Sequence, residues 1–139
     1  MSARLPYPDG TLELALLPDA LAICRLDPAT PLPPWAQEGA FHSITRTVHE
    51  LSVVCAEHLV PGNVRCERGW RCLAVNGPLD FTLTGVLAGL AAPLAEAGIS
   101  IIAISTFDTD YLLVKQPYLQ QAVEVLVRSG YVVHREDIW

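Results

Sequence analysis

The segment Ser100–Lys115, "SIIAISTFDTDYLLVK", carries most of the fold information in this chain of 139 residues. Two apolar runs flank the four residues Thr106–Thr109, a length that suits the turn of a β-hairpin. The first run is continuously apolar, which is typical of a strand buried at the centre of a sheet. The dense polar residues between the runs belong either to a tight turn or to a binding site.

A strand and a helix are expected before this hairpin. The strand is Trp70–Asn76, "WRCLAVN", and the Gly-Pro pair that follows it breaks the pattern. The helix is expected over Leu83–Ala97, where leucine and valine recur at helical spacing. Thr82 or Thr84 can cap its start, and Gly98 is a stop signal.

A second helix and a last strand are expected after the hairpin. The helix begins at about Pro117, because proline is tolerated in the first turn, and it ends at Gly130. The strand is Tyr131–His134, "YVVH". The resulting order β-α-β-β-α-β over Trp70–Asp137 predicts a ferredoxin-like arrangement, with two helices on one face of a four-stranded antiparallel sheet.

The N-terminal half of the chain is richer in strand patterns and poorer in helix patterns. Four segments read as strands: "TLELALL", "ALAICRL", "FHSITRT" and "ELSVVCAE". The proline-rich "DPATPLPPW" is a loop, and at most Pro34–Gly39 forms a single helical turn.

The two halves also show a short internal echo. Ser43–Val54 aligns with Ala103–Val114 at an offset that matches Glu50 with Asp110. We therefore expect an α+β fold of two related ferredoxin-like units, a degenerate strand-rich unit over residues 1–66 and a complete βαββαβ unit over residues 67–139. A unit without helices cannot cover its own sheet, so we expect the two to pack as one body.

Composition excludes several classes of partner. The formal net charge is −6 and the sequence contains no Lys/Arg cluster, which argues against nucleic acid and anionic membranes. No apolar run reaches the roughly 18 residues of a membrane span, and the start "MSARLPYPDG" lacks the apolar region of a signal peptide. We expect a soluble, cytoplasmic protein.

The four cysteines, Cys24, Cys55, Cys66 and Cys72, are expected to be reduced thiols. Cys55 and His58 are spaced like metal ligands, but the paired C-x-x-C spacing of zinc sites is absent. The sequence also contains no recognisable catalytic triad and no phosphate-binding loop. It therefore predicts no catalytic residues, no metal and no cofactor.

The loop Asn76–Gly85 and the turn "STFDTD" are expected to lie close together, because the first and third strands of a ferredoxin-like sheet are neighbours. A helix start offers free N–H groups and a positive dipole end, which suit a carboxylate. Gly85 allows a ligand to approach the backbone, while Asp80 and Asp110 can receive an ammonium group. This combination describes a site for a free amino acid.

Local structure accounts for the same residues without any ligand. In this alternative, Thr82 and Thr84 are helix caps and nothing more, and Asp108 and Asp110 do no more than shape a turn. Gly85, in the same alternative, does no more than allow close packing of the helix. An Asp-x-Asp cation site is a further alternative, although hard cations require more oxygen ligands than this turn supplies.

Two segments add a family resemblance to this interpretation. Phe81–Lys115, "FTLTGVLAGLAAPLAEAGISIIAISTFDTDYLLVK", closely resembles the C-terminal ACT unit of small tandem-ACT proteins related to the CASTOR-type arginine sensors. Phe41–Cys55, "FHSITRTVHELSVVC", resembles their N-terminal unit. The resemblance spans roughly Leu12 to Val133. It implies tandem ACT units that form a non-catalytic regulatory module for small ligands, typically amino acids.

The resemblance also implies the residues of a ligand site between ACT units. Carried over position by position, they are Asp80, Phe81, Leu83, Thr84, Gly85, Ser105, Thr106, Phe107 and Asp110. Leu83 stands where the arginine sensors have a glutamate that would pair with a guanidinium group, so a neutral or apolar amino acid is implied in place of arginine. Reproducing the four-unit sensors requires a homodimer, and a regulated protein partner is implied. A structural module that binds no ligand is the alternative.

Overall fold

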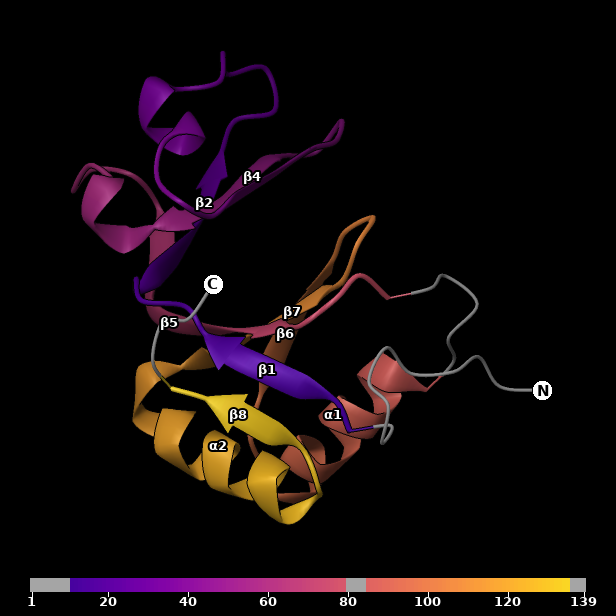
Figure 1. Ribbon diagram of the computed structural model, residues 1–139. Helices are drawn as coiled ribbons and strands as arrows, with labels where there is room; N and C mark the ends of the chain where they lie inside the picture. The colour runs from indigo at the N-terminus through magenta and orange to yellow at the C-terminus, as the bar shows by residue number, and fades with distance from the viewer. Residues whose placement is uncertain (1–10, 80–84, 136–139) are drawn as a thin grey trace. The chain divides into compact units, whose positions relative to one another are not determined.

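The computed structural model describes residues 11–79 and 85–135 (Figure 1). Contacts divide this chain into two compact units. The N-terminal unit comprises residues 19–70, and the C-terminal unit comprises the described parts of the rest, residues 11–18, 71–79 and 85–135. Strand β5 (Cys66–Val75) contributes its first half to the N-terminal unit and its second half to the C-terminal unit. The expected boundary at residue 66 between two related units stays a prediction.

The sheet of the C-terminal unit is mixed. Its strand order is β6-β7-β5-β1-β8, in which β1 and β8 pair in parallel and β1 pairs with β5 antiparallel. The strands not yet located are β1 (Glu13–Leu16), β6 (Ile101–Ser105), β7 (Asp110–Lys115) and β8 (Val132–His134). The sequence correctly predicts a strand near residues 11–17 but assigns it to the N-terminal unit. In the structure, β1 is inserted between the first and last strands of the βαββαβ unit, where Leu14 is fully buried in that unit's core.

Helices α1 (Val86–Glu96) and α2 (Leu119–Arg128) cover one face of this sheet (Figure 1). The short 3-10 helix η3 (Gln116–Tyr118) leads into α2. Both predicted stop signals are confirmed, since Gly98 and Gly130 have φ of 76° and 99°. The Ile99 N–H donates to the Leu94 carbonyl at 2.9 Å, which closes α1 in the manner of a Schellman motif.

Leucine and valine from sheet and helices form the core of the C-terminal unit. Its fully or almost fully buried members are Leu12, Leu14, Leu73, Val75, Leu90, Leu94, Ile99, Leu112, Val114, Leu119, Ala122, Val123, Val125 and Leu126. This core holds the start of α1 against the β6–β7 hairpin, and thereby positions the candidate site.

Strand β6 differs from the expected central strand. Within the described part of the C-terminal unit it pairs only with β7, and Ile102 is 36% exposed. A continuous apolar run indicates a strand but cannot by itself distinguish a central strand from an edge strand that another surface covers. The predicted start of the first helix near Leu83, with its caps Thr82 and Thr84, lies outside the described residues, and the described helix begins after Gly85.

The N-terminal unit is an antiparallel sheet in the order β3-β4-β2-β5. Its other strands are β2 (Leu21–Leu26), β3 (His42–Arg46) and β4 (Leu51–Ala56). This is the ferredoxin-like strand order, with short 3-10 helices η1 (Pro34–Gln37) and η2 (Glu57–Leu59) at the chain positions of the two helices. The prediction that this segment contains no long helix is confirmed. Its core comprises Ala22, Cys24, Ala36, Leu51, Val53, Cys55 and Val60.

The internal echo is real at the level of the hairpins but is shifted by one residue. Arg46 pairs with Leu51 across the β3–β4 turn, and Ser105 pairs with Asp110 across the β6–β7 turn. Asp110 therefore corresponds to the buried Leu51 and not to Glu50. Since the residue at that position is a leucine, the β3–β4 hairpin has no carboxylate that corresponds to Asp110.

None of the helices in the described part of the chain is long and apolar enough to cross a membrane.

Candidate functional site

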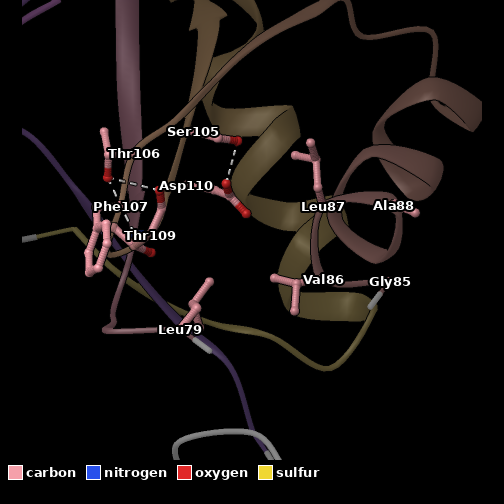
Figure 2. Close-up of a pocket in the computed structure, with 10 residues that line it drawn as sticks. All are labelled: Leu79, Gly85, Val86, Leu87, Ala88, Ser105, Thr106, Phe107, Thr109 and Asp110. Carbon is pink, nitrogen blue, oxygen red and sulfur yellow. Dashed lines mark hydrogen bonds between the residues drawn. The ribbon is translucent and has the colours of Figure 1, made fainter. Parts of the chain in front are cut away.

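A pocket of about 300 Å³ lies in the C-terminal unit between the start of α1 and the β6–β7 turn (Figure 2). It is lined by Leu79, Gly85, Val86, Leu87, Ala88, Ser105, Thr106, Phe107, Thr109 and Asp110. The structure thus brings together the part of the predicted site that it describes, namely Gly85, Ser105, Thr106, Phe107 and Asp110. The remaining predicted positions, Asp80, Phe81, Leu83 and Thr84, lie outside the described residues.

Asp110 is the one charged residue among the described residues that line this pocket. Ser105 and Asp110 face each other across the hairpin, and the Ser105 hydroxyl donates a hydrogen bond of 2.6 Å to Asp110 Oδ1. Figure 2 shows the carboxylate on the side of the turn that faces Leu87 of α1. A carboxylate accepts up to about four hydrogen bonds, so the contact with Ser105 orients Asp110 and leaves capacity for a donor on a ligand.

The two threonines of the turn use their hydroxyl protons within the protein. Thr106 Oγ1 donates to the Thr109 carbonyl at 3.1 Å and accepts from the Thr109 N–H at 3.3 Å. Thr109 Oγ1 donates to the Val75 carbonyl at 2.6 Å, which ties the turn to β5. A hydroxyl group has a single proton, so Thr106 and Thr109 can serve a ligand only as acceptors. In the structure, their hydrogen bonds stabilise the conformation of the turn.

The loop that follows β5 packs directly against this turn. The Leu79 N–H donates to the Asp108 carbonyl at 2.6 Å. A Cβ atom at Gly77 would lie 2.9 Å from the Asp108 carbonyl oxygen and 3.0 Å from Thr109 Cβ. The close approach of the loop and the turn therefore requires glycine at position 77. From the sequence, Gly77 was predicted only to end a strand.

The start of α1 supplies the polar backbone groups of the pocket. Gly85 is the N-cap residue, with φ of 80° and no side-chain cap hydrogen bond, and an added Cβ would meet none of the described atoms within 4 Å. The first N–H groups of any α-helix have no partner within the helix, and they carry its positive dipole end. Gly85 itself is exposed, and Val86, Leu87 and Ala88, which carry the first of these N–H groups, line the pocket.

Apolar side chains form the remaining wall. Leu79, Val86 and Leu87 are partly buried and pack against the core of the C-terminal unit. Phe107 is 80% exposed at the tip of the turn and lies at the rim of the pocket (Figure 2). Five lining residues were not predicted as site residues, namely Leu79, Val86, Leu87, Ala88 and Thr109. Leu79 and Thr109 lie within the predicted loop and turn, and Val86, Leu87 and Ala88 directly follow the loop, so position in the sequence is the one signal for them.

Metal-binding side chains do not gather in the described residues. Among residues 11–79 and 85–135, no group of three or more His, Cys, Asp or Glu side chains is arranged to hold a metal ion. Asp108 and Asp110 have different surroundings, since Asp110 lines the pocket with Ser105 and Asp108 contributes its backbone carbonyl to the loop contact.

Comparison with known proteins identifies the family. A family model described as an ACT domain matches residues 65–128, and a model of an N-terminal domain matches residues 19–63. The crystal structure of protein Atu0741 from Agobacterium tumefaciens is 38% identical, covers 91% of this chain and 94% of that chain, and superposes with a TM-score of 0.86. The chain belongs to the ACT-domain family. ACT domains are regulatory modules that bind small ligands such as amino acids.

This ACT-domain protein is also similar to part of a curated protein and to the fold of a solved enzyme structure. The human cytosolic arginine sensor for mTORC1 subunit 1 is 43% identical over 60 residues, which are 42% of this chain and 18% of that protein. The chain therefore matches less than a fifth of the length of this curated relative. Aspartate kinase from Clostridium acetobutylicum matches at 12% identity with a TM-score of 0.64, over 87% of this chain and 35% of that one. That likeness concerns the fold alone, and the predicted α+β, ACT-like fold is confirmed.

Proposed function

We propose that this ACT-domain protein is a non-catalytic sensor that binds a free amino acid in the pocket beside Asp110 and regulates another protein. The observation that carries the proposal is the pairing of an oriented carboxylate with a helix start in one pocket of about 300 Å³. An amino acid carries one ammonium and one carboxylate group, and the pocket offers a complementary group for each.

The walls of the pocket favour a particular class of side chain. The ligand ammonium contacts Asp110, and its carboxylate lies against the first N–H groups of α1. Its side chain then faces Leu79, Val86 and Leu87. A guanidinium group needs a carboxylate partner of its own, and Asp110, the one charged residue among the described lining, already holds the ammonium, so a neutral or apolar amino acid is favoured over arginine.

The same proposal covers assembly and location. The edge strand β6 offers backbone donors and acceptors to a second copy of the chain, which would form a homodimer by sheet extension. A cytoplasmic location agrees with the cytosolic arginine sensor to which part of the chain is similar.

A thermal-shift screen of the twenty amino acids at millimolar concentration tests the binding. A ligand at 100 times its dissociation constant stabilises the folded chain by about 2.7 kcal/mol. We expect a shift with a neutral or apolar amino acid, loss of that shift in Asp110→Asn, and its retention in the matched control Asp108→Asn. No shift with any amino acid, or an equal shift in Asp110→Asn and in the wild type, contradicts the proposal.

A structural module without a ligand is the second candidate function. It is favoured by the exposure of large apolar side chains near the hairpin, since Ile102 on β6 is 36% exposed and Phe107 is 80% exposed. Surfaces of this kind often mark contacts with other proteins. Light scattering that shows a dimer insensitive to all amino acids and to Asp110→Ala supports this second function over the first.

A further inference from the structure

Three of the four cysteines lie on one face of the sheet in the N-terminal unit. Cys24 is on β2, Cys55 on β4 and Cys66 on β5, and β2 lies between the other two strands. Cys24 and Cys55 are buried in the core, and Cys66 packs against it while remaining partly exposed. Cys24 lies opposite Cys66 on one neighbouring strand and diagonal to Cys55 on the other. The proposed ligand pocket contains none of them.

Cys24 and Cys66 are directly opposite each other in the ladder between β2 and β5. In the next pair along the ladder, the Arg25 N–H donates to the Arg65 carbonyl at 2.9 Å, so Arg25 and Arg65 form a hydrogen-bonded pair. Pairs alternate along an antiparallel ladder, so Cys24 and Cys66 form a non-hydrogen-bonded pair, whose Cα atoms are typically about 4.5 Å apart. This separation lies within the range of about 4.4 to 6.8 Å that disulfide bonds span.

Cys55 is placed less well for a bond with Cys24. On β4 it lies opposite Ala22, which makes it a diagonal neighbour of Cys24. Diagonal neighbours in a sheet have Cα atoms about 7 to 8 Å apart, beyond the usual reach of a disulfide. A disulfide between Cys24 and Cys55 would therefore require the backbone to move.

We propose that Cys24 and Cys66 are an oxidation site, at which hydrogen peroxide converts the two thiols into a reversible cross-strand disulfide. The Cys66 thiolate attacks one oxygen of the peroxide, the O–O bond breaks, and the departing oxygen leaves as water after protonation. The Cys24 sulfur then attacks the Cys66 sulfenic acid, the S–S bond forms and the S–O bond breaks. The hydroxyl leaves as a second water with the proton of Cys24, and two electrons have passed from the thiols to the peroxide.

Exposure and protonation set the order of these steps. Cys66 is the thiol of the pair that solvent reaches, whereas Cys24 is only 1% exposed. The pKa of Cys24 is raised, first by its hydrogen bond with Cys55 and then by burial, so it remains a thiol at neutral pH. Cys66 is therefore the residue that meets the oxidant, and Cys24 is the residue that resolves the sulfenic acid.

Peptide mapping of the full chain tests the site. The reduced protein is treated with one equivalent of hydrogen peroxide, its free thiols are alkylated, and it is digested without reductant for mass spectrometry. We expect one linked pair of peptides that contain Cys24 and Cys66, two hydrogens lighter than their sum and separated again by dithiothreitol. The bridge should persist in Cys55→Ala and Cys72→Ala and be absent in Cys66→Ser.

Mapping of the wild-type chain alone decides the matter even if a variant fails to fold. A Cys24–Cys55 bridge, a Cys66 that proceeds to sulfinic acid with Cys24 still free, or four unreacted thiols each overturns the proposal. Circular dichroism of the peroxide-treated chain, recorded beside the untreated chain, confirms that the mapped protein is folded.

Discussion

Asp110 carries the charge of the proposed site, and the groups around it determine whether that charge is usable. Ser105 orients its carboxylate from the opposite strand, while the hydroxyl groups of Thr106 and Thr109 donate to backbone carbonyls that hold the turn. Position 110 is also what distinguishes the two hairpins, since the corresponding residue of the β3–β4 hairpin is the buried Leu51. We therefore expect ligand binding at one hairpin and not at the other.

Ser105→Ala tests the orienting contact. The change removes the 2.6 Å hydrogen bond to Asp110 and leaves the charge in place. Hydrogen bonds to charged groups contribute about 1.5 to 3 kcal/mol, and exposure of Ser105 puts this one at the lower end, so affinity for the amino acid should fall by about tenfold. Calorimetric titration measures the loss, with the exposed Ser100→Ala as control. Equal affinities in the two variants would show that Ser105 does not orient the site.

Gly77→Ala tests the contact between loop and turn. The new Cβ would meet backbone at 2.9 Å, and overpacking of this kind costs about 1 to 3 kcal/mol. Urea unfolding should show that loss in the free energy of unfolding. Gly62→Ala is the matched control, because a Cβ there meets no atom within 4 Å, and its effect should stay within about 0.5 kcal/mol. A neutral Gly77→Ala would mean that the loop can move away from the turn.

Among the elements, the ends of helices and the pairing of β5 with β7 were predicted, whereas the places of β1 and β6 in the sheet were not. Gly98 and Gly130 end their helices because glycine readily adopts positive φ, a local property that the sequence displays. The insertion of β1 and the edge position of β6 depend on pairing between segments that are distant in the sequence. The spacing of hydrophobic residues within a strand does not indicate which other strand it pairs with. The same distinction holds for the site. The loop and the turn were predicted, whereas only the structure shows that Leu79 and Thr109, which lie within them, also line the pocket.

The proposed disulfide belongs to the element scale because it joins β2 to β5. It closes a loop of about 40 residues, for which the chain-entropy model gives about 4 kcal/mol of stabilisation. Urea unfolding of the oxidised and the reduced chain should show a higher midpoint for the oxidised form, and no difference in Cys66→Ser. An oxidised chain that contains the bridge and is less stable than the reduced chain would indicate strain at this pair.

For the whole molecule, we expect assembly through the β6 edge. Ile102→Lys places a charge on this edge strand, and charged residues on edges are known to oppose pairing between chains. Light scattering should show a dimer for the wild type and a monomer for Ile102→Lys. Val127→Lys, on the exposed face of α2, is the control and should remain dimeric. A wild-type monomer, or an Ile102→Lys dimer, contradicts the proposed interface.

The central claim is that a free amino acid occupies the pocket between α1 and the β6–β7 turn. A crystal structure of the chain with the amino acid that gives the largest thermal shift tests it most directly. We predict that the ligand ammonium lies within hydrogen-bond distance of the Asp110 carboxylate and that the ligand carboxylate contacts the first N–H groups of α1. A pocket filled by packed side chains of the protein itself, with the ligand bound elsewhere or absent, would contradict the claim.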